Sequence, residues 1–191
     1  MAIEYEATFA NVNKTDIRQR LKAVGATLVR PEFLQKRVNF NLPESHQIKG
    51  GWLRVRDEGN RTTMSLKIID GETITDQKEI QLVVDSFSEA KNLLASIGCR
   101  EKAFQESRRE LWLLDEVEVT IDEWPFLEPF VEVEGVSEAA VKAVAEKLGF
   151  DYSLAKFCAV DVLYSEKYGL SFDRINNQTP EITFAMDNPF I

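Results

Sequence analysis

Three stretches of the chain space their apolar residues three or four positions apart, which places those residues on one face of an α-helix. Each stretch follows a residue that caps helix N-termini and ends before a glycine, which readily adopts the left-handed backbone conformation. The predicted helices are residues 14–24, 87–97 and 138–148, with Ile17, Leu21, Val24, Leu93, Leu94, Ile97, Val141, Val144 and Leu148 facing inward. A fourth stretch, residues 153–167, is predicted to be a less regular amphipathic helix.

Most of the remaining chain alternates between apolar and polar residues and is rich in Val, Ile, Thr and aromatic residues, as β-strands are. Turn residues separate these segments, for example at Asp70-Gly71, and favour antiparallel hairpins. The predicted strands are residues 2–9, 33–41, 51–57, 62–69, 73–84, 103–114, 116–123 and 129–135. The pattern is that of an α+β domain.

Charged residues on these strands are sorted by sign. Glu4 and Glu6 share one face of their strand, whereas Arg54 and Arg56 share one face of another. Exposed strands usually mix Lys, Glu and Thr because like charges on neighbouring positions repel. Any one of these strands alone fits a solvent-exposed outer face. The sorting across strands favours a closed barrel whose apolar faces are covered by the helices and whose charged faces point into the lumen.

Composition excludes several classes of protein. The 191 residues fit one domain, and the formal net charge of -9 disfavours non-specific binding to nucleic acid or to an anionic membrane. Two cysteines and one histidine supply neither a disulfide framework nor a zinc site. The N-terminus lacks the features of a signal peptide and no apolar run is long enough to span a bilayer, so we expect a cytoplasmic protein.

The predicted lumen has an acidic side and a basic side, and this arrangement indicates its ligand. Clustered carboxylates without His or Cys suit Mg²⁺ or Mn²⁺, while Arg and Lys hold phosphate oxygens through charge-assisted hydrogen bonds. A ligand that needs both sides is a metal-bound polyphosphate. The same arrangement recurs in enzymes of phosphoryl transfer.

At these residues the sequence resembles the CYTH superfamily, the triphosphate tunnel metalloenzymes that include class IV adenylyl cyclases and thiamine or inorganic triphosphatases. The resemblance runs from residue 3 to about residue 169. It rests on an ordered set of segments: Glu4-Tyr5-Glu6, Leu53-Arg54-Val55-Arg56, Ser65-Leu66-Lys67, Lys78-Glu79, Arg108-Arg109-Glu110-Leu111-Trp112, Asp122, and Phe130-Val131-Glu132-Val133-Glu134.

The resemblance implies a fold and a set of roles. The fold is a closed antiparallel eight-stranded tunnel with helices packed on the outside, spanning residues 1–169, with residues 170–191 as an extension packed on the same domain. The implied metal ligands for Mg²⁺ or Mn²⁺ are Glu4, Glu6, Asp122, Glu132 and Glu134. The implied triphosphate-binding residues are Arg54, Arg56, Lys67, Lys78 and Arg109, with Lys36 and Arg37 near the entrance. Glu4, Glu6, Glu134 and Arg56 are the residues expected to act in catalysis.

One position departs from the family's pattern. Thr8 stands where the first-strand motif ExExK has lysine. The loss of that cation is expected to weaken the grip on a terminal phosphate or to shift the preferred substrate. If residues 2–9 form one strand, a lysine at position 8 would enter the tunnel beside Glu4 and Glu6.

Three functions remain open at the level of sequence. The first is metal-dependent hydrolysis of an inorganic or organic triphosphate. The second is cyclisation of ATP to cyclic AMP and pyrophosphate, and the third is binding of polyphosphate or nucleotide without catalysis. The expected partner is a small-molecule triphosphate, with no nucleic acid and no membrane, and a homodimer is left open.

Overall fold

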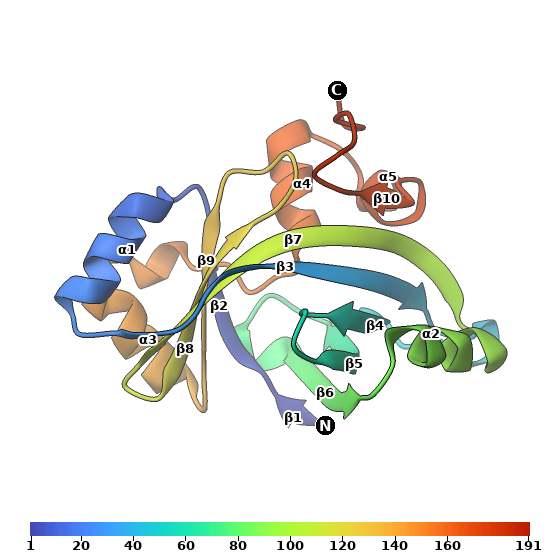
Figure 1. Ribbon diagram of the computed structural model, residues 1–191, viewed down its shortest axis with the longest axis horizontal. Helices are drawn as coiled ribbons and strands as arrows, with labels where there is room; N and C mark the ends of the chain where they lie inside the picture. The colour runs from blue at the N-terminus through green and yellow to red at the C-terminus, as the bar shows by residue number, and fades with distance from the viewer.

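The computed structural model describes residues 1–191 and confirms an antiparallel barrel with helices packed outside it (Figure 1). Hydrogen-bonded strands follow one another around a single sheet. Their order is β1 (Ala2–Ile3), β6 (Gln77–Val84), β5 (Thr62–Ile69), β4 (Gly51–Asp57), β3 (Thr27–Asn41), β7 (Arg100–Leu114), β8 (Val117–Glu123), β9 (Phe130–Gly135) and β2 (Tyr5–Phe9). Off this path, β10 (Glu181–Ile182) pairs in parallel with β7.

The barrel has nine strands rather than the eight predicted, because the first predicted strand is divided at Glu4. Before the division β1 pairs with β6, and after it β2 pairs with β9. The Glu6 N–H donates to the Glu4 carbonyl at 3.1 Å, which closes a γ-turn around Tyr5 and interrupts the ladder. One short N-terminal stretch thereby joins the two ends of the sheet and nearly closes the barrel.

The strands β3 and β7 are longer than predicted, with 15 residues each, and arch over the rest of the barrel (Figure 1). The first of these two strands was predicted to begin only at residue 33, after Pro31. In the structure the pairing passes Pro31 with register shifts, and Leu28 still lies opposite Trp112. These two strands therefore form one long ribbon that links the two halves of the barrel.

The three helices predicted with high periodicity are present as α1 (Lys14–Ala23), α2 (Phe87–Ser96) and α3 (Glu138–Lys147). The side chains of Asn13, Ser86 and Ser137 accept hydrogen bonds from backbone N–H groups of the first turns. Glycines 25, 98 and 149 follow the helices with positive φ. The largest core lies between α1, α3 and the outer faces of β2, β8 and β9.

The prediction that Leu93 and Ile97 face inward is wrong. Their exposed fractions are 53% and 58%, and α2 buries Ala90 and Leu94 instead. The helix covers a small apolar cluster on the outer face of β3 and β4 that contains Val55. The apolar cluster is narrower than the apolar face of α2. The helix therefore buries the edge of this face that carries Ala90 and Leu94 and leaves the edge with Leu93 and Ile97 in solvent.

The fourth predicted helix is shorter than expected. Residues Tyr152–Leu154 form a 3₁₀ turn, and α4 spans only Val160–Tyr168. Between them the backbone of Lys156 exchanges two hydrogen bonds with that of Thr8, at 2.9 and 3.0 Å. This bridge requires an extended backbone at Lys156 and therefore excludes a continuous helix.

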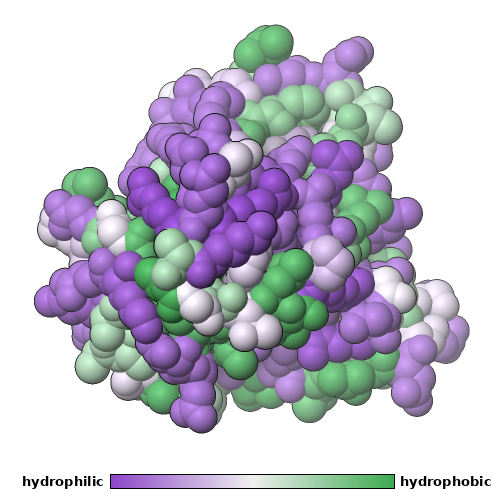
Figure 2. Space-filling view, turned by 60° about the vertical axis from the view of Figure 1, so that its left-hand side comes forward, coloured by the Kyte–Doolittle hydropathy of each residue, from purple (hydrophilic) through white to green (hydrophobic).

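The C-terminal extension packs against one side of the barrel. It contains α5 (Phe172–Asn177) and β10, neither of which was predicted. Ile175, Ile182 and Phe190 pack with Tyr164 of α4 in a second apolar core. None of the helices is both long enough and apolar enough to cross a membrane. The face shown in Figure 2 is mainly hydrophilic, with hydrophobic areas separated by polar side chains.

Candidate functional site

A cavity of about 370 Å³ occupies the interior of the barrel. Eight carboxylates and seven cationic side chains line it, so it is almost neutral although the chain carries a net charge of -9. The carboxylates are Glu4, Glu6, Glu58, Glu79, Glu118, Glu132, Glu134 and Asp161; the cations are Arg37, Arg54, Arg56, Arg61, Lys67, Lys102 and Arg109. Seven of the 23 Lys and Arg side chains therefore face one enclosed space, where an anionic ligand could meet them.

Three of the predicted metal ligands converge in this cavity. Glu4 and Glu6, on either side of the γ-turn, and Glu134 on β9 each present a carboxylate oxygen, and these oxygens all lie within 4.8 Å of one another. Glu6 lies directly opposite Glu134 in the sheet, which accounts for their approach. Glu132, two residues before Glu134 on the same face of β9, lines the same cavity.

Burial and mutual repulsion disfavour the charged form of this carboxylate cluster. Burial raises the pKa of Glu4 to about 7, against the opposing effect of Lys67. Burial, followed by repulsion from Glu132, raises the pKa of Glu6 well above its ordinary value. The pKa values of Glu132 and Glu134 are also raised, chiefly by burial. A group of carboxylates in this state gains most from a cation that can approach all of them.

Lys67 is the cation closest to this cluster. Its Nζ lies 3.0 Å from Glu4 Oε1 and 2.9 Å from Oε2. Burial alone would lower the pKa of Lys67, but attraction from Glu6 and Glu4 outweighs it and raises the pKa. Next to it Arg54 Nη2 donates to Glu79 Oε1 at 3.0 Å. Glu79 is therefore paired with a basic neighbour inside the barrel.

Arg56 and Arg109 each face a carboxylate. Arg56 Nη2 lies 2.8 Å from Oε1 of Glu58, which is almost completely buried. Burial followed by repulsion from Arg54 lowers the pKa of Arg56 to about 9. Arg109 donates to both oxygens of Asp122 at 2.8 Å and also pairs with Glu132. Asp122, a predicted metal ligand, is fully buried, does not line the cavity and is not among the three carboxylates that converge there.

Arg37 differs from the other arginines of the cavity because it has no carboxylate partner. Its Nη2 donates to Gln35 Oε1 at 2.8 Å and to the Ser107 hydroxyl, and its guanidinium carbon lies 4.3 Å from the centre of the Trp124 ring. Burial and the neighbouring Arg56 lower its pKa well below the ordinary value. An uncompensated buried guanidinium favours an anion nearby.

Unpartnered polar atoms indicate what the cavity can bind. The Nε atoms of Arg37, Arg54 and Arg56 are buried without hydrogen-bond partners. Buried polar atoms normally have a partner, so three free guanidinium donors fit an anion with several oxygens. The oxygen-only donor set of Glu4, Glu6 and Glu134 fits a hard divalent cation such as Mg²⁺ or Mn²⁺.

The structure does not bring every predicted site residue into the cavity. Lys78 and Lys36 have exposed side chains outside the cavity lining, so their predicted placement in the tunnel and near its entrance is wrong. Lys78 neighbours the inward-facing Glu79, and Lys36 neighbours the inward-facing Arg37. Because side chains alternate along a strand, each of these lysines points to the opposite side of the sheet.

Thr8 is not part of the cavity lining either. Its exposed fraction is 3%, and its backbone pairs with that of Lys156. Thr8 does lie opposite Glu132, on the face of β2 that carries Glu6. The expected direction of its side chain is therefore correct, but the side chain is buried outside the cavity lining and does not enter the tunnel as expected.

Several cavity residues could not be recognised from the sequence. Glu58 follows β4 in a segment that has the composition of an ordinary turn. Lys102 is the extra residue of a β-bulge in β7. The neighbouring residues Asn39 and Phe40 of β3 pair with Ala103 and Glu101, so Lys102 has no partner opposite it. Asn176, from the C-terminal extension, donates to Asp161 Oδ2 at 2.5 Å. The only signal for these residues was their polarity within an otherwise unassigned segment.

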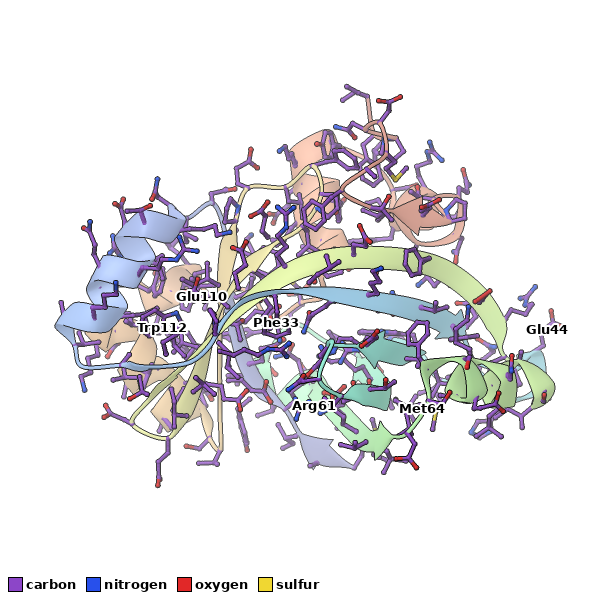
Figure 3. The ribbon with its side chains drawn as sticks, viewed as in Figure 1. Phe33, Glu44, Arg61, Met64, Glu110 and Trp112 are labelled. Carbon is purple, nitrogen blue, oxygen red and sulfur yellow. The ribbon has the colours of Figure 1, made fainter.

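Figure 3 labels two side chains of the cavity lining, Phe33 and Arg61, and two side chains near α1, Glu110 and Trp112. Phe33 of β3 and Arg61 of the β4–β5 turn lie near the middle of the view, and both line the cavity. Glu110 and Trp112 lie on the opposite face of β7, close to α1. There Arg18 of α1 pairs with Glu110 at 2.8 Å, and Trp112 Nε1 donates to Glu110 at 2.7 Å.

Known proteins with similar structures share this barrel. A protein from Pyrococcus horikoshii is 22% identical, with a TM-score of 0.69 over 84% of this chain and 98% of that chain. A candidate adenylate cyclase from Vibrio parahaemolyticus is 12% identical, with a TM-score of 0.73 over 85% of this chain and 98% of that chain. A candidate adenylyl cyclase from Hippeastrum with a dominant triphosphatase activity is 13% identical, with a TM-score of 0.59 over 89% of this chain and 99% of that chain.

Among curated proteins there is no significant match to the sequence. The family model of the CYTH domain, in contrast, matches residues 2–161. This range contains every strand of the barrel and all the carboxylates of the cavity. The chain therefore belongs to the CYTH domain family.

Proposed function

We propose that this protein is a triphosphatase that hydrolyses a small-molecule triphosphate with the help of Mg²⁺ or Mn²⁺. The observation that carries the proposal is a single cavity in which Glu4, Glu6 and Glu134 converge and unpartnered guanidinium donors are buried. A divalent cation and a polyphosphate would each satisfy one of these two sets. Membership of the CYTH domain family supports the same assignment.

Each set of residues has a distinct role in this proposal. Glu4, Glu6 and Glu134 would hold the cation, with Glu132 beside them. The bound cation would neutralise charge on the phosphate oxygens and act as a Lewis acid. Arg54 and Arg56 form ion pairs with Glu79 and Glu58 through their Nη2 atoms. The Nε donors of both arginines therefore remain free for phosphate.

Arg37 and Arg109 contribute in different ways. Arg37, without a carboxylate partner, offers the least compensated positive charge for a phosphate oxygen. Arg109 is held by Asp122 and reaches Glu132, so it would orient this carboxylate and join the cation side to the phosphate side. Asp122 is proposed to position Arg109 and not to bind metal directly.

Cyclisation of ATP and binding without catalysis are alternative outcomes of the same arrangement. Both would use the same cation and the same arginines. In cyclisation the ribose 3′-oxygen replaces water as the attacking group. The Hippeastrum protein has a dominant triphosphatase activity on the same fold, so this barrel is compatible with hydrolysis.

The direct test is to identify products after incubation with Mg²⁺ or Mn²⁺ and tripolyphosphate, thiamine triphosphate or ATP. We expect release of orthophosphate from at least one of these compounds, and EDTA should abolish it because carboxylates bind these ions reversibly. Pyrophosphate with cyclic AMP would establish the cyclase instead. Tight binding without any product would establish a binding module, and undiminished activity in EDTA would refute the metal assignment.

A pair of arginine variants makes the test specific to the cavity. Arg56→Ala should weaken binding of tripolyphosphate by about 2–5 kcal/mol if its guanidinium makes a desolvated charge pair with phosphate. Arg100→Ala is the matched control, because Arg100 is exposed and pairs with Glu44 outside the cavity. Equal affinity in both variants would show that Arg56 does not contact the ligand.

A further inference from the structure

The interruption between β1 and β2 brings two carboxylates into one cluster. An uninterrupted strand would continue its ladder past Glu4, but here the Glu6 N–H bonds to the Glu4 carbonyl and bends the chain at Tyr5. The carboxylates of Glu4 and Glu6 then both meet that of Glu134. The geometry of the proposed cation site therefore depends on the γ-turn.

Gln77 bonds to the backbone on both sides of the γ-turn, first by the last bond of the β1–β6 ladder and then by its side chain. Its backbone carbonyl accepts from the Glu4 N–H at 3.0 Å. Its side-chain amide donates from Nε2 to the Glu6 carbonyl at 2.7 Å. A carbonyl only accepts hydrogen bonds, so the amide must present its NH₂ group there. One residue of β6 thus holds the turn on both sides.

Gln77 is itself held firmly. Its side chain is fully buried, and the Glu6 carbonyl is the only partner of its amide. The 3₁₀ turn Ile74–Asp76 precedes it directly, with Ile74 anchored in the largest core and a reciprocal cap between Thr73 and Asp76. The position of Gln77 is therefore determined by packing that does not involve the cavity.

We infer that Gln77 is a positioning residue for the carboxylates of the cation site. Where the chain leaves β6, the Glu6 carbonyl loses its partner in the sheet. The side-chain amide of Gln77 takes the place of that partner and keeps the γ-turn closed. Without its amide, the Glu6 carbonyl loses its partner in a buried location, and the turn relaxes so that the carboxylates of Glu4 and Glu6 separate. This inference rests on the proposed role of Glu4, Glu6 and Glu134 in binding a divalent cation.

The test compares Mn²⁺ binding to the wild-type protein, Gln77→Met and Gln77→Asn, by calorimetry and by electron paramagnetic resonance, without substrate. Met keeps the length but lacks the donor, and Asn keeps the amide but is one methylene shorter. We expect both to bind Mn²⁺ about 10–100-fold more weakly, the usual effect of removing a group that orients a metal ligand. We also expect faster hydrogen exchange at the Glu4 and Glu6 amides of the metal-free variants.

The control is Gln47→Met. Gln47 also donates to backbone carbonyls, those of Leu42 and Pro43, but lies in a loop outside the cavity. A merely structural role of Gln77 would lower the thermal midpoint without changing the Mn²⁺ affinity of the folded protein, and that result would overturn the inference. If one of the two Gln77 variants fails to fold, hydrogen exchange at the Glu4 and Glu6 amides of the other variant decides whether Gln77 holds the γ-turn. Wild-type protein that binds no Mn²⁺ would instead refute the proposed cation site.

Discussion

At the scale of single residues, many of the charges in the cavity already have partners of opposite charge, although Arg37 has none. Lys67 contacts Glu4, Arg54 contacts Glu79, and the site is ordered by these pairs. A buried ion pair of this kind gains little net stability, because desolvation offsets most of the attraction, but removing one partner is costly. Substitutions in the cavity are therefore expected to affect binding and stability together, and a new charge needs space as well as a partner.

Position 8 tests this requirement for space. Thr8→Lys should lower the free energy of unfolding by about 1–3 kcal/mol, because a longer side chain must be accommodated at a position whose exposed fraction is only 3%. It should not tighten binding of tripolyphosphate. Urea unfolding and calorimetric titration measure the two effects. Thr8→Val, which adds neither length nor charge, is the control and should lower stability less than the lysine variant does. Tighter binding in the lysine variant would show that the surroundings of position 8 yield and that this position reaches the ligand.

At the scale of elements, the C-terminal extension supplies part of the wall of the barrel. The strand β8 pairs only with residues 108–114 of β7, whereas β10 pairs with Phe104 and Gln105. The extension therefore occupies the edge of β7 that β8 leaves uncovered. Ile175 and Asn176 of α5 line the cavity from this side. Loss of the packing under β10 should affect both stability and the shape of the cavity.

Ile182→Ala tests the contribution of this element. Ile182 is fully buried in the second core, so the substitution should lower the free energy of unfolding by about 2–5 kcal/mol. Phe172→Ala, in the same extension, is the control because Phe172 is 52% exposed, and it should have a much smaller effect. Denaturant unfolding of both variants provides the comparison. Equal stability losses would mean that the extension is not packed through β10.

Sequence patterns identified elements whose signals are local. The capped helices that end before Gly25, Gly98 and Gly149 were predictable because the caps and glycines lie next to each helix in the sequence. The faces of Glu6 and Arg56 followed from alternation. Lys78 was misplaced because one position of register decides which side of the sheet a residue faces. The γ-turn at Tyr5, the extended Lys156 and the pairing of β10 depend on partners distant in the chain, and no local pattern encodes them.

At the scale of the whole molecule, the cavity gathers carboxylates whose charged forms are disfavoured. Glu4 has a pKa raised to about 7, and the pKa values of Glu6, Glu132 and Glu134 are raised as well, chiefly by burial. Groups with raised pKa values bind protons more tightly in the folded state than in the unfolded state. Their contribution to stability is complete below the unfolded pKa, near 4.5, and is lost as the pH rises through the folded pKa.

The metal-free protein should therefore become less stable as the pH rises from about 5 to about 7. Glu79, whose pKa is lowered to about 2, acts with the opposite sign but in the more acidic range. Thermal unfolding in EDTA across this range measures the trend, and Glu4→Gln should make it shallower. Saturating Mn²⁺ should raise the midpoint most at the upper end, because a ligand of the folded state stabilises it. A profile that is flat or rises with pH would contradict this account of the cluster.

The backbone bridge between Thr8 and Lys156 also bears on how the chain is made. During synthesis from the N-terminus, β2 emerges long before β9 and the segment around Lys156, which are its two neighbours in the finished sheet. Hairpins between successive strands, such as β4 with β5, can form as they leave the ribosome, but β2 waits with unpaired N–H and C=O groups. Contacts of such long sequence separation form slowly. Barrel closure, and with it the grouping of Glu6 with Glu134, therefore comes late in synthesis, and a nascent chain stalled before residue 130 lacks β9 and both of its inward-facing carboxylates, Glu132 and Glu134.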